Sequence, residues 1–595
     1  MKKQPYFHAL SFCENCVDYY HQSKKSRHVF LIPFLVFLSM MNMGCADLHV
    51  ESSGSAIIKT TVDRSIVPDA VPAGSTVRID DPANFKIKGY GEWSYGPGIP
   101  YEKRLDLMAN GYDNGPVTKK KTLMRFFTMT DIHITDKESP AQAIYFRKSP
   151  YIKDNAVSVY SPLMLYTTHV LDAAVQTING LNTPNNKIDF GLSLGDMANN
   201  SQYNELRWFI DIMDGGTINP DSGKKDDPIP GPSNDYQDEF VAKGLNSSIP
   251  WYATMGNHDH FWIGSKPLNE KIDSAMIGDK ILQVGNIFSG STEMKKNTYS
   301  TGTLDGSTLY GTIIGEGRTD SLGTIPPVSP DPNRRAITKT DFINEFSHTT
   351  SLPKGHGFIE PESKNVFGSC YSFEPKSDLP VKVIVLDDTM DESDFPYKEG
   401  FCGHGSLSNG RYGWLMGQLK AGQDESKLMI IAAHIPIGIA GASSPFSWIP
   451  VPGSFESEAS LLSQLKTYPN LILWVAGHRH LNTVTAMPSE TPGHPENGFW
   501  EVETKSLREF PQEFRTFELA LNSDNTLSIF ATDVDPDVKV GSFADISRHY
   551  ALASNLIYGI MNPPAGTGPS VYNAELVIQL SPEMQTKIAS SKIPQ

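Results

Sequence analysis

Cysteine is scarce in this sequence, with five in 595 residues. Cys13 and Cys16 form a CxxC pair, but they lie upstream of an N-terminal targeting segment and have no partner cysteines. We expect export to remove them, which argues against a redox or thiolate metal site at this pair. Cys370 and Cys402 can form a disulfide in an exported protein, and no spacing rule decides whether they do.

Blocks of positive charge and long hydrophobic runs are also missing. The formal net charge is −16, and charged residues make up 20% of the chain. A protein that binds duplex DNA or a bilayer surface usually has a basic face, so we expect no nucleic-acid binding. The apolar run from Val29 to Met43 is too short for a membrane-spanning helix.

This apolar run has the features of a secretory signal. A basic segment, Lys24–His28, precedes it, and Gly44 and Cys45 follow it. The Gly-Cys pair resembles a bacterial lipoprotein cleavage site, although Asn42 stands where leucine is usual. We predict export to the periplasm, the outer membrane or the extracellular space. Lipidation of Cys45, which would tether the protein to a membrane, is left open.

The length predicts one large domain with additions. We expect a signal segment at 1–44, a tether and N-terminal extension at 45–120, a main domain at 121–535, and a C-terminal extension of helix and loop at 536–595. Residues 261–365 are rich in Gly, Ser, Thr, Asn and Pro and interrupt the main domain. We interpret them as an insertion that forms a lid or selects the substrate, and a decorative loop is the alternative.

The main domain alternates buried strands with helices, which predicts an α/β fold. Apolar and β-branched runs predict strands at 123–130, 188–194, 250–255, 381–387, 428–433 and 471–476. Helical spacing of apolar residues predicts helices at 161–179, 205–213, 410–421 and 457–466. Segments 498–504, 513–521 and 526–532 alternate like antiparallel strands and are expected to complete a second sheet.

Five strands end in polar residues of the same kinds. These residues are Asp131 and His133, Asp196, Asn257 and His258, His434, and His478 and His480. Ligands of α/β sheets gather at the carboxyl ends of strands. Burying so many imidazoles and carboxylates costs free energy, and a cation offsets that cost.

The types of ligand indicate which ions they bind. Carboxylate, imidazole and amide oxygen without thiolate suit Zn, Mn, Fe or Co. Seven ligands are too many for one ion, so we expect two divalent or trivalent ions that share a carboxylate. Such ions would also supply the positive charge that an acidic protein needs to act on phosphates.

The polar strand ends form an ordered series of motifs. They are Asp131-x-His133, Gly195-Asp196-x-x-Asn199, Gly256-Asn257-His258-Asp259, His434 and Gly477-His478-x-His480. As a set, they resemble the five motifs of the calcineurin-like metallophosphoesterase superfamily, over about residues 123–510. The resemblance implies a four-layer αββα sandwich with a dinuclear metal site on one edge.

The resemblance also implies a role for each residue. The first metal ion would be bound by Asp131, His133 and His480, the second by Asn257, His434 and His478, and both by Asp196. His258 would face the phosphate as a catalytic residue, and Asp259 would orient it. Arg479 would point away from the two flanking histidines.

The activity implied is hydrolysis of a small phosphorylated substrate, with a metal-bridging hydroxide that attacks phosphorus directly. The same ligands serve phosphomonoesterases, including nucleotidases, and phosphodiesterases of cyclic nucleotides or phospholipids, so the motifs leave both open. A non-catalytic phosphate-binding protein is a third alternative, which the complete ligand set disfavours. A metallo-β-lactamase-type hydrolase would need a clustered HxHxDH, which is absent.

Five residues near these motifs are weaker candidates. Asn199 is expected to order its loop, and His260 to contact substrate or lie at the surface. Lys505 and Arg508 either bind substrate phosphate or form structural ion pairs. His356 lies in a Gly-rich loop and can line the site. The oligomeric state and the native metals are not predicted.

Overall fold

The computed structural model describes the chain from residue 58 onwards, with gaps. The described residues are 58–79, 81–142, 162–224, 235–279, 299–303, 312–317, 328–358, 368–391, 403–439, 448–449, 457–559 and 572–590. Residues 1–57, which include the predicted signal segment and Cys45, lie outside the described residues. Within the described part, no helix is long and apolar enough to cross a membrane.

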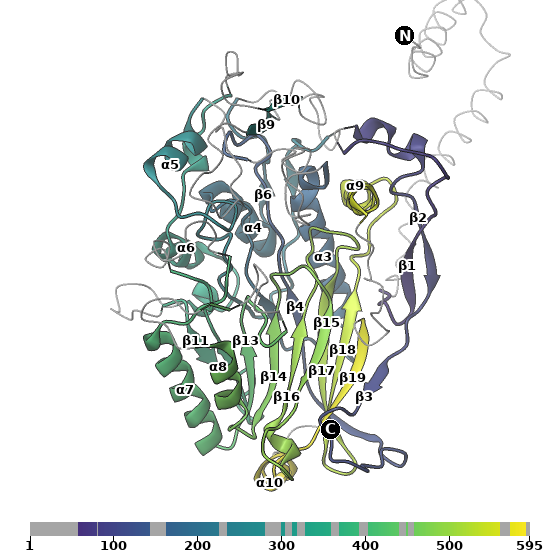
Figure 1. The fold of residues 1–595 in the computed structure, drawn as a ribbon, viewed down its shortest axis with the longest axis vertical. Helices are drawn as coiled ribbons and strands as arrows, with labels where there is room; N and C mark the ends of the chain where they lie inside the picture. Colours follow the sequence, from purple (N-terminus) through teal and green to yellow (C-terminus); the bar gives the residue numbers. More distant parts are fainter. Residues whose placement is uncertain are drawn as a thin grey trace, which may run out of the picture. The chain divides into compact units, whose positions relative to one another are not determined.

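Two large sheets form the centre of the domain (Figure 1). The first sheet has the strand order β3 (Glu102–Arg104), β19 (Asn573–Ile578), β18 (Leu527–Val534), β17 (Phe514–Asn522), β4 (Lys119–Met129), β5 (Phe190–Ser193) and β8 (Trp251–Ala253). The second has the order β11 (Tyr371–Phe373), β12 (Val381–Val385), β13 (Leu428–Ala432), β14 (Leu471–Ala476), β16 (Phe499–Glu503) and β15 (Thr483–Met487). Strands β4, β5 and β8 are parallel to one another, as are β12, β13, β14 and β16.

The inner faces of the two sheets share one hydrophobic core. Phe126 of β4 stacks on Phe190 of β5 and on Phe517 of β17, with ring centroids 4.9 and 4.8 Å apart. Phe190 also meets Phe373 of the second sheet edge to face at 5.4 Å. Each fully buried side chain of this kind stabilises the fold by about 1.5–3 kcal/mol. The core therefore holds the two sheets face to face.

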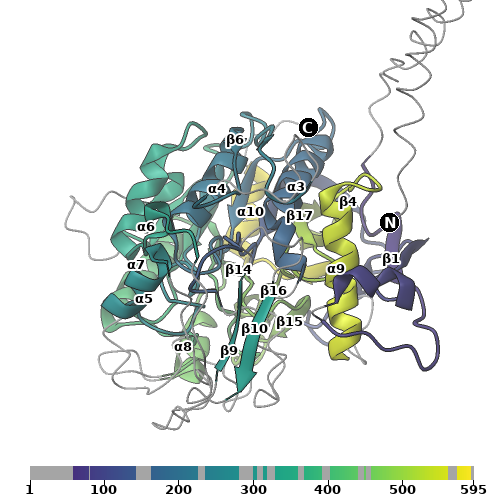
Figure 2. The same ribbon diagram turned by 90° about the horizontal axis from the view of Figure 1, so that it is seen from above.

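Helices cover the outer faces of both sheets. Helices α3 (Thr167–Leu181) and α4 (Tyr203–Asp214) pack on the first sheet, where Phe209 meets Trp251 edge to face at 5.9 Å. Helices α7 (Asn409–Asp424) and α8 (Glu458–Leu465) pack on the second through buried Leu415 and Leu461. Figure 2 shows α3 and α4 together on one side of the sheets. The predicted αββα architecture is confirmed.

The assignment of the late strands to the second sheet is right for one of them and wrong for two. Strand β16 is in that sheet, parallel to β14 and antiparallel to β15. Strands β17 and β18 are antiparallel to each other, as predicted, but they belong to the first sheet, where β17 pairs with β4. Alternating polarity specifies a strand with one buried face, but it does not specify which sheet the strand joins.

Both terminal extensions contribute strands to the domain. The C-terminal one contains α9 (Phe543–Tyr558), β19 and α10 (Pro582–Ser590), and β19 pairs with β18. The prediction of helix and loop alone is therefore wrong there. The N-terminal one contains a hairpin, β1 (Arg64–Pro68) and β2 (Trp93–Pro97), and then β3, which pairs with β19.

Part of the predicted insertion belongs to the core. Its described elements are α5 (Glu270–Ile277), the strands β9 (Tyr299–Thr303) and β10 (Thr312–Gly317), and α6 (Lys339–Glu345). Phe342 and Phe346 are buried in the same core as α4, and Phe346 meets Trp251 edge to face at 6.0 Å. Residues 328–358 are therefore not a lid. A short hairpin, β6 (Thr217–Ile218) and β7 (Phe240–Val241), follows α4.

Candidate metal centre

The carboxyl ends of the parallel strands of both sheets meet at one edge. Within the first sheet, the Asp131 N–H donates to the Gly195 carbonyl at 3.1 Å. Within the second, the Gly477 N–H donates to the His434 carbonyl at 2.9 Å. Between the sheets, the His478 N–H donates to Asp131 Oδ2 at 2.8 Å. All five predicted polar strand ends therefore lie together.

Two glycines allow this close approach. A Cβ atom at residue 256 would lie 2.2 Å from the backbone nitrogen of Asp196, and one at residue 477 would lie 2.0 Å from Thr130 Oγ1. Neither distance is sterically allowed, so Gly256 and Gly477 are required where the loops touch.

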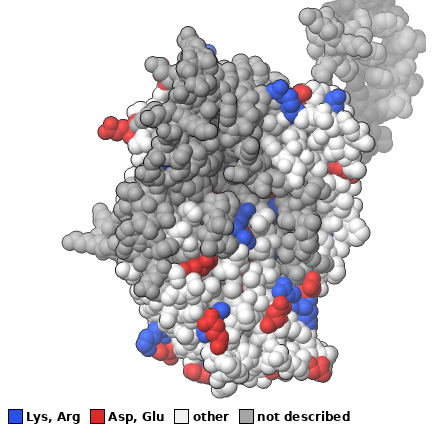
Figure 3. Space-filling view, in the orientation of Figure 1, with Lys and Arg blue, Asp and Glu red and all other residues white. Residues whose placement is uncertain are grey.

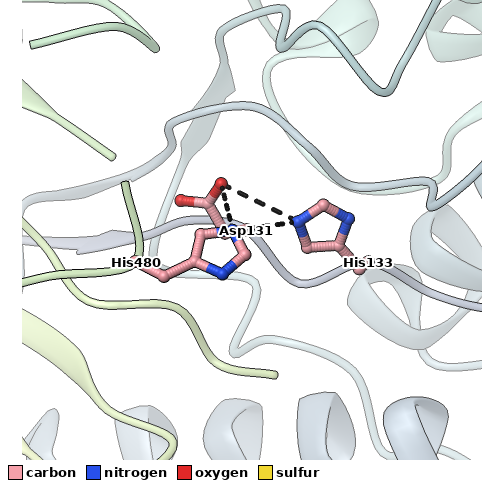
Figure 4. Close-up of side chains that lie close together, drawn as sticks. All are labelled: Asp131, His133 and His480. Carbon is pink, nitrogen blue, oxygen red and sulfur yellow. Dashed lines mark hydrogen bonds and ion pairs between the residues drawn. The ribbon is translucent and has the colours of Figure 1, made fainter. Parts of the chain in front are cut away.

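The first cluster consists of Asp131, His133 and His480 (Figure 4). His480 Nε2 lies 3.2 Å from both Asp131 Oδ1 and His133 Nε2. His133 Nε2 lies 3.9 Å from the same carboxylate oxygen. All three side chains are buried or nearly so.

The second cluster consists of Asn257, His434 and His478. His434 Nε2 lies 2.9 Å from Asn257 Oδ1 and 3.2 Å from His478 Nδ1. Asn257 Nδ2 donates to the Gly264 carbonyl at 2.8 Å, which turns Oδ1 toward the cluster. His434 Nδ1 donates to the Leu194 carbonyl at 2.8 Å, so Nε2 keeps its lone pair.

Asp196 lies between the two clusters. Its Oδ2 atom is 3.3 Å from His434 Nε2 and 3.7 Å from His133 Nε2. Its Oδ1 atom accepts a hydrogen bond from the His258 N–H at 2.7 Å, which fixes the carboxylate in place. The geometry thus places one carboxylate oxygen beside both clusters.

The donor atoms of both clusters fit metal ions. Nitrogen and oxygen atoms that face one another at about 3 Å need a proton or a metal ion between them. Ligand atoms about 2.0–2.2 Å from a zinc-like ion lie about 3.0–3.5 Å from one another, which is close to most of these separations, although His133 Nε2 lies farther from Asp131 Oδ1, at 3.9 Å. The residues could therefore hold a metal ion in each cluster.

The charge of the clusters also favours cations. Burial alone would lower the pKa of His434, but the carboxylates of Asp196, Asp131 and Asp388 outweigh it and raise the pKa to about 10. Burial is likewise outweighed at His480, where Glu509 and Asp131 raise the pKa to about 10. Each cluster therefore attracts a positive charge strongly enough to hold a proton in alkaline solution.

Five of the seven proposed ligands have a left-handed backbone. Their φ angles are 51° at Asp131, 49° at His133, 53° at Asp196, 75° at His478 and 57° at His480. Non-glycine residues in this region cost about 1–3 kcal/mol each and persist where the surroundings hold them. The turns that aim these side chains are strained, a feature that the motif spacing did not predict.

His258 lies beside the first cluster and the carboxylate of Asp196. Its side chain, His133 and Asp196 each place a ligand atom within 4.8 Å of the other two. Its Nδ1 donates to the Asn199 carbonyl at 2.7 Å, so Nε2 is the free ring nitrogen. The rings of His258 and His133 meet edge to face at 4.5 Å.

The prediction that Asp259 orients His258 is wrong. The Asp259 carboxylate accepts four backbone N–H groups, those of Asp196, Met197, Ala198 and Gly256, at 2.8–3.0 Å. These bonds occupy both oxygens and fold the loop of the second motif around the carboxylate. The Asn199 carbonyl orients His258 instead.

Glu509 is a residue that the sequence analysis missed. Its Oε1 atom lies 3.1 Å from His480 Nδ1, on the side of the ring away from Asp131. A carboxylate behind a ligating histidine fixes the ring and increases its basicity. The one feature of the sequence that could have indicated this role is the position of Glu509 in the segment that follows β16.

The weaker candidates have mostly structural roles. His260 is buried and bonds Thr389 Oγ1 at 3.0 Å, so it does not lie at the surface, which was one of its two predicted alternatives. His356 is buried against Trp251, with ring centroids 3.5 Å apart, and does not line the site. Arg479 forms an ion pair with Glu503 at 2.6 Å.

Lys505 and Asn199 differ in their relation to the clusters. Lys505 is buried, and its charge interacts with Glu513, Glu509 and Asp533 rather than with Asp131 or Asp196. Asn199 accepts a hydrogen bond from Arg508 Nη1 at 2.9 Å and donates to Gln142. Cys370 is buried and free, and Cys402 lies outside the described residues.

A buried set of histidines and carboxylates on an αββα edge defines a class of metal-dependent hydrolases. Residues 124–325 match the family model of calcineurin-like phosphoesterases. This match agrees with the resemblance that the motifs predicted. The match includes the first three motifs, and the structure brings His434, His478 and His480 to them.

Comparison with solved structures found similar proteins at low identity. A dimetal phosphatase from Danio rerio is 10% identical, with a TM-score of 0.35 over 70% of this chain and 100% of that one. The sulfate thiohydrolase SoxB of Thermus thermophilus in complex with glycerol is 10% identical, with a TM-score of 0.27 over 75% of this chain and 62% of that one. A comparison with curated proteins found no match.

Proposed function

We propose that this protein hydrolyses phosphate esters with two metal ions, one in each cluster. The observation that carries the proposal is the position of Asp196, whose Oδ2 atom lies beside the histidines of both clusters. A shared carboxylate is the feature that turns two separate sites into a two-metal clamp. His258 supplies an additional side chain at the same place.

The ions, when bound, lower the pKa of a water molecule so that it becomes a hydroxide nucleophile near neutral pH, and they offset phosphate charge. The protein holds their ligands rigidly. Asp131 Oδ2 is fixed by the Thr130 hydroxyl and the His478 N–H. The Asn257 amide and the His434 ring are each fixed by a backbone carbonyl. The ligands are thus aligned before the reaction.

His258 would complete the reaction as a proton donor. The oxygen of water forms a bond to phosphorus, the ester P–O bond breaks, and the departing alkoxide takes a proton from His258 Nε2. The proton released from water restores His258, so one ester and one water give one alcohol and one phosphate. Burial lowers the pKa of His258, and an anionic phosphate beside the ring would raise it again.

We propose that the substrate is a small phosphorylated molecule. On the face shown in Figure 3, acidic and basic side chains of the described residues are interspersed, without an extended basic patch. Phosphodiesters remain the alternative substrates, and export of the chain, with or without lipidation of Cys45, remains a proposal that rests on the N-terminal sequence.

An activity panel tests the proposal. The protein from residue 46 onwards is stripped of metal, supplied with Mn²⁺, Zn²⁺, Co²⁺ or Fe²⁺, and assayed with p-nitrophenyl phosphate and its bis-ester. We expect turnover of at least one ester that disappears with chelator. A protein that binds two ions and hydrolyses neither ester would contradict the proposed function.

A further inference from the structure

Arg508 is a buried cation next to the metal centre with most of its donors unused. Its side chain is 1% exposed, and it follows β16, the parallel strand beside β14. Nη1 donates to Asn199 Oδ1 at 2.9 Å. Nε and Nη2 have no hydrogen-bond partner among the described residues, and no carboxylate there forms an ion pair with this guanidinium.

These unused donors point to an oxyanion ligand. An unsatisfied buried donor costs about 1–3 kcal/mol, and such groups in native proteins require an explanation. The Nε–H and the adjacent Nη2–H lie on the same edge of the guanidinium, and this edge matches two oxygens of a phosphate. Burial lowers the pKa of Arg508 to about 10, so it keeps its charge at neutral pH.

Asn199 connects this edge to the reaction site. Its side-chain oxygen holds Arg508, and its carbonyl holds His258 at 2.7 Å. The charge of Arg508 also interacts with the carboxylates Asp131 and Asp196 of the clusters. One residue therefore bonds both His258 and Arg508, which places Arg508 next to the reaction site.

Charge identifies the class of substrate. Two divalent ions carry four positive charges, and Asp131, Asp196 and a hydroxide nucleophile offset three of them. The one positive charge that is left balances the single negative charge of a diester. Arg508 adds a second positive charge. A phosphomonoester at neutral pH is largely a dianion, because its second pKa is about 6. The charge of Glu509 interacts with both Arg508 and Lys505.

We propose that Arg508 binds two oxygens of the substrate phosphate through Nε and Nη2, and that this contact makes the enzyme prefer phosphomonoesters over phosphodiesters. This inference rests on the proposed function. When each ion contacts one oxygen, a monoester has a third non-bridging oxygen left for Arg508, whereas a diester can offer Arg508 only oxygens that already contact the ions. Lys505, in the same segment, faces Glu513 and Glu509 and takes no part in this contact.

Phosphate binding and ester preference test the inference together. The variants are Arg508→Gln and Arg508→Lys, which keeps the positive charge but lacks the paired N–H donors of the guanidinium. For each manganese-loaded protein, calorimetry measures the affinity for inorganic phosphate, mass spectrometry measures metal content, and circular dichroism measures folding. Activity is compared on p-nitrophenyl phosphate and its bis-ester.

We expect Arg508→Gln to weaken phosphate binding by at least about tenfold and to lower monoester kcat/KM by about 100-fold, with metal content unchanged. Diester kcat/KM should change by less than about threefold, and Arg508→Lys should be intermediate. Unchanged phosphate affinity and ester preference in Arg508→Gln would overturn the inference, and the proposed function would stand. If the wild type hydrolyses neither ester, the proposed function fails, and phosphate affinity still decides the role of Arg508.

Discussion

The strongest prediction concerns the carboxylate that lies between the two clusters. Asp196→Asn keeps the shape of the side chain and the acceptor for the His258 N–H, but it removes the negative charge. A carboxylate and a unit positive charge 4 Å apart attract by about 4 kcal/mol at an effective dielectric constant of about 20. Each tenfold change in affinity corresponds to about 1.4 kcal/mol, so each ion should bind about a thousandfold more weakly.

The matched control is Asp131→Asn, because Asp131 belongs only to the first cluster. Metal content is measured by mass spectrometry after dialysis against equal Mn²⁺, and circular dichroism checks the fold. We expect Asp131→Asn to keep one ion per chain and Asp196→Asn to lose both. Retention of two ions at wild-type affinity by Asp196→Asn would refute the shared-carboxylate model.

Three further predictions concern single histidines and their partners. His258→Ala should lower kcat/KM by about 100-fold with both ions retained, because it removes the proton donor but no ligand. Glu509→Gln should weaken binding of one ion by about 10–100-fold in metal titrations, because it removes the carboxylate behind His480. Burial lowers the pKa of His356 to about 4, below its unfolded value of about 6.5. As the pH falls, the unfolded chain therefore binds a proton at His356 before the folded chain does. The neutral buried ring contributes to stability above about pH 6.5, and this contribution is lost as the pH falls toward 4. Glutamine takes no proton. Between pH 7.5 and pH 5, the free energy of unfolding measured with urea should therefore fall by about 2 kcal/mol less in His356→Gln than in the wild type.

Each of these predictions has a clear contrary result. Metal loss from His258→Ala would make His258 a ligand, and unchanged metal affinity in Glu509→Gln would leave Glu509 without a role at His480. Equal acid sensitivity of the wild type and His356→Gln would show that the buried ring is protonated in the folded protein.

The sequence predicted which residues meet, because parallel strands place their carboxyl ends at one edge of a sheet. Asp131, Asp196, Asn257, His434 and His478 follow five such strands, and the structure brings them together. The αββα layers followed from the same alternation of strands and helices.

The sequence did not predict contacts that depend on how loops cross between elements. The chain after β16 crosses to the first sheet, where the Leu507 N–H bonds the Thr130 carbonyl, and this crossing places β17 beside β4. The same segment brings Glu509 to His480. Asp259 turns toward backbone N–H groups of a loop 60 residues earlier in the sequence, a long-range pairing that its neighbour His258 did not reveal.

Stepwise metal addition to the wild-type protein is the most direct test of the two-metal centre. Metal-free protein is titrated with Mn²⁺ while bound metal and release of p-nitrophenol are followed in the same sample. The two-cluster geometry predicts that activity reaches its maximum at two ions per chain. Full activity in the presence of chelator, or at one ion per chain, would contradict it.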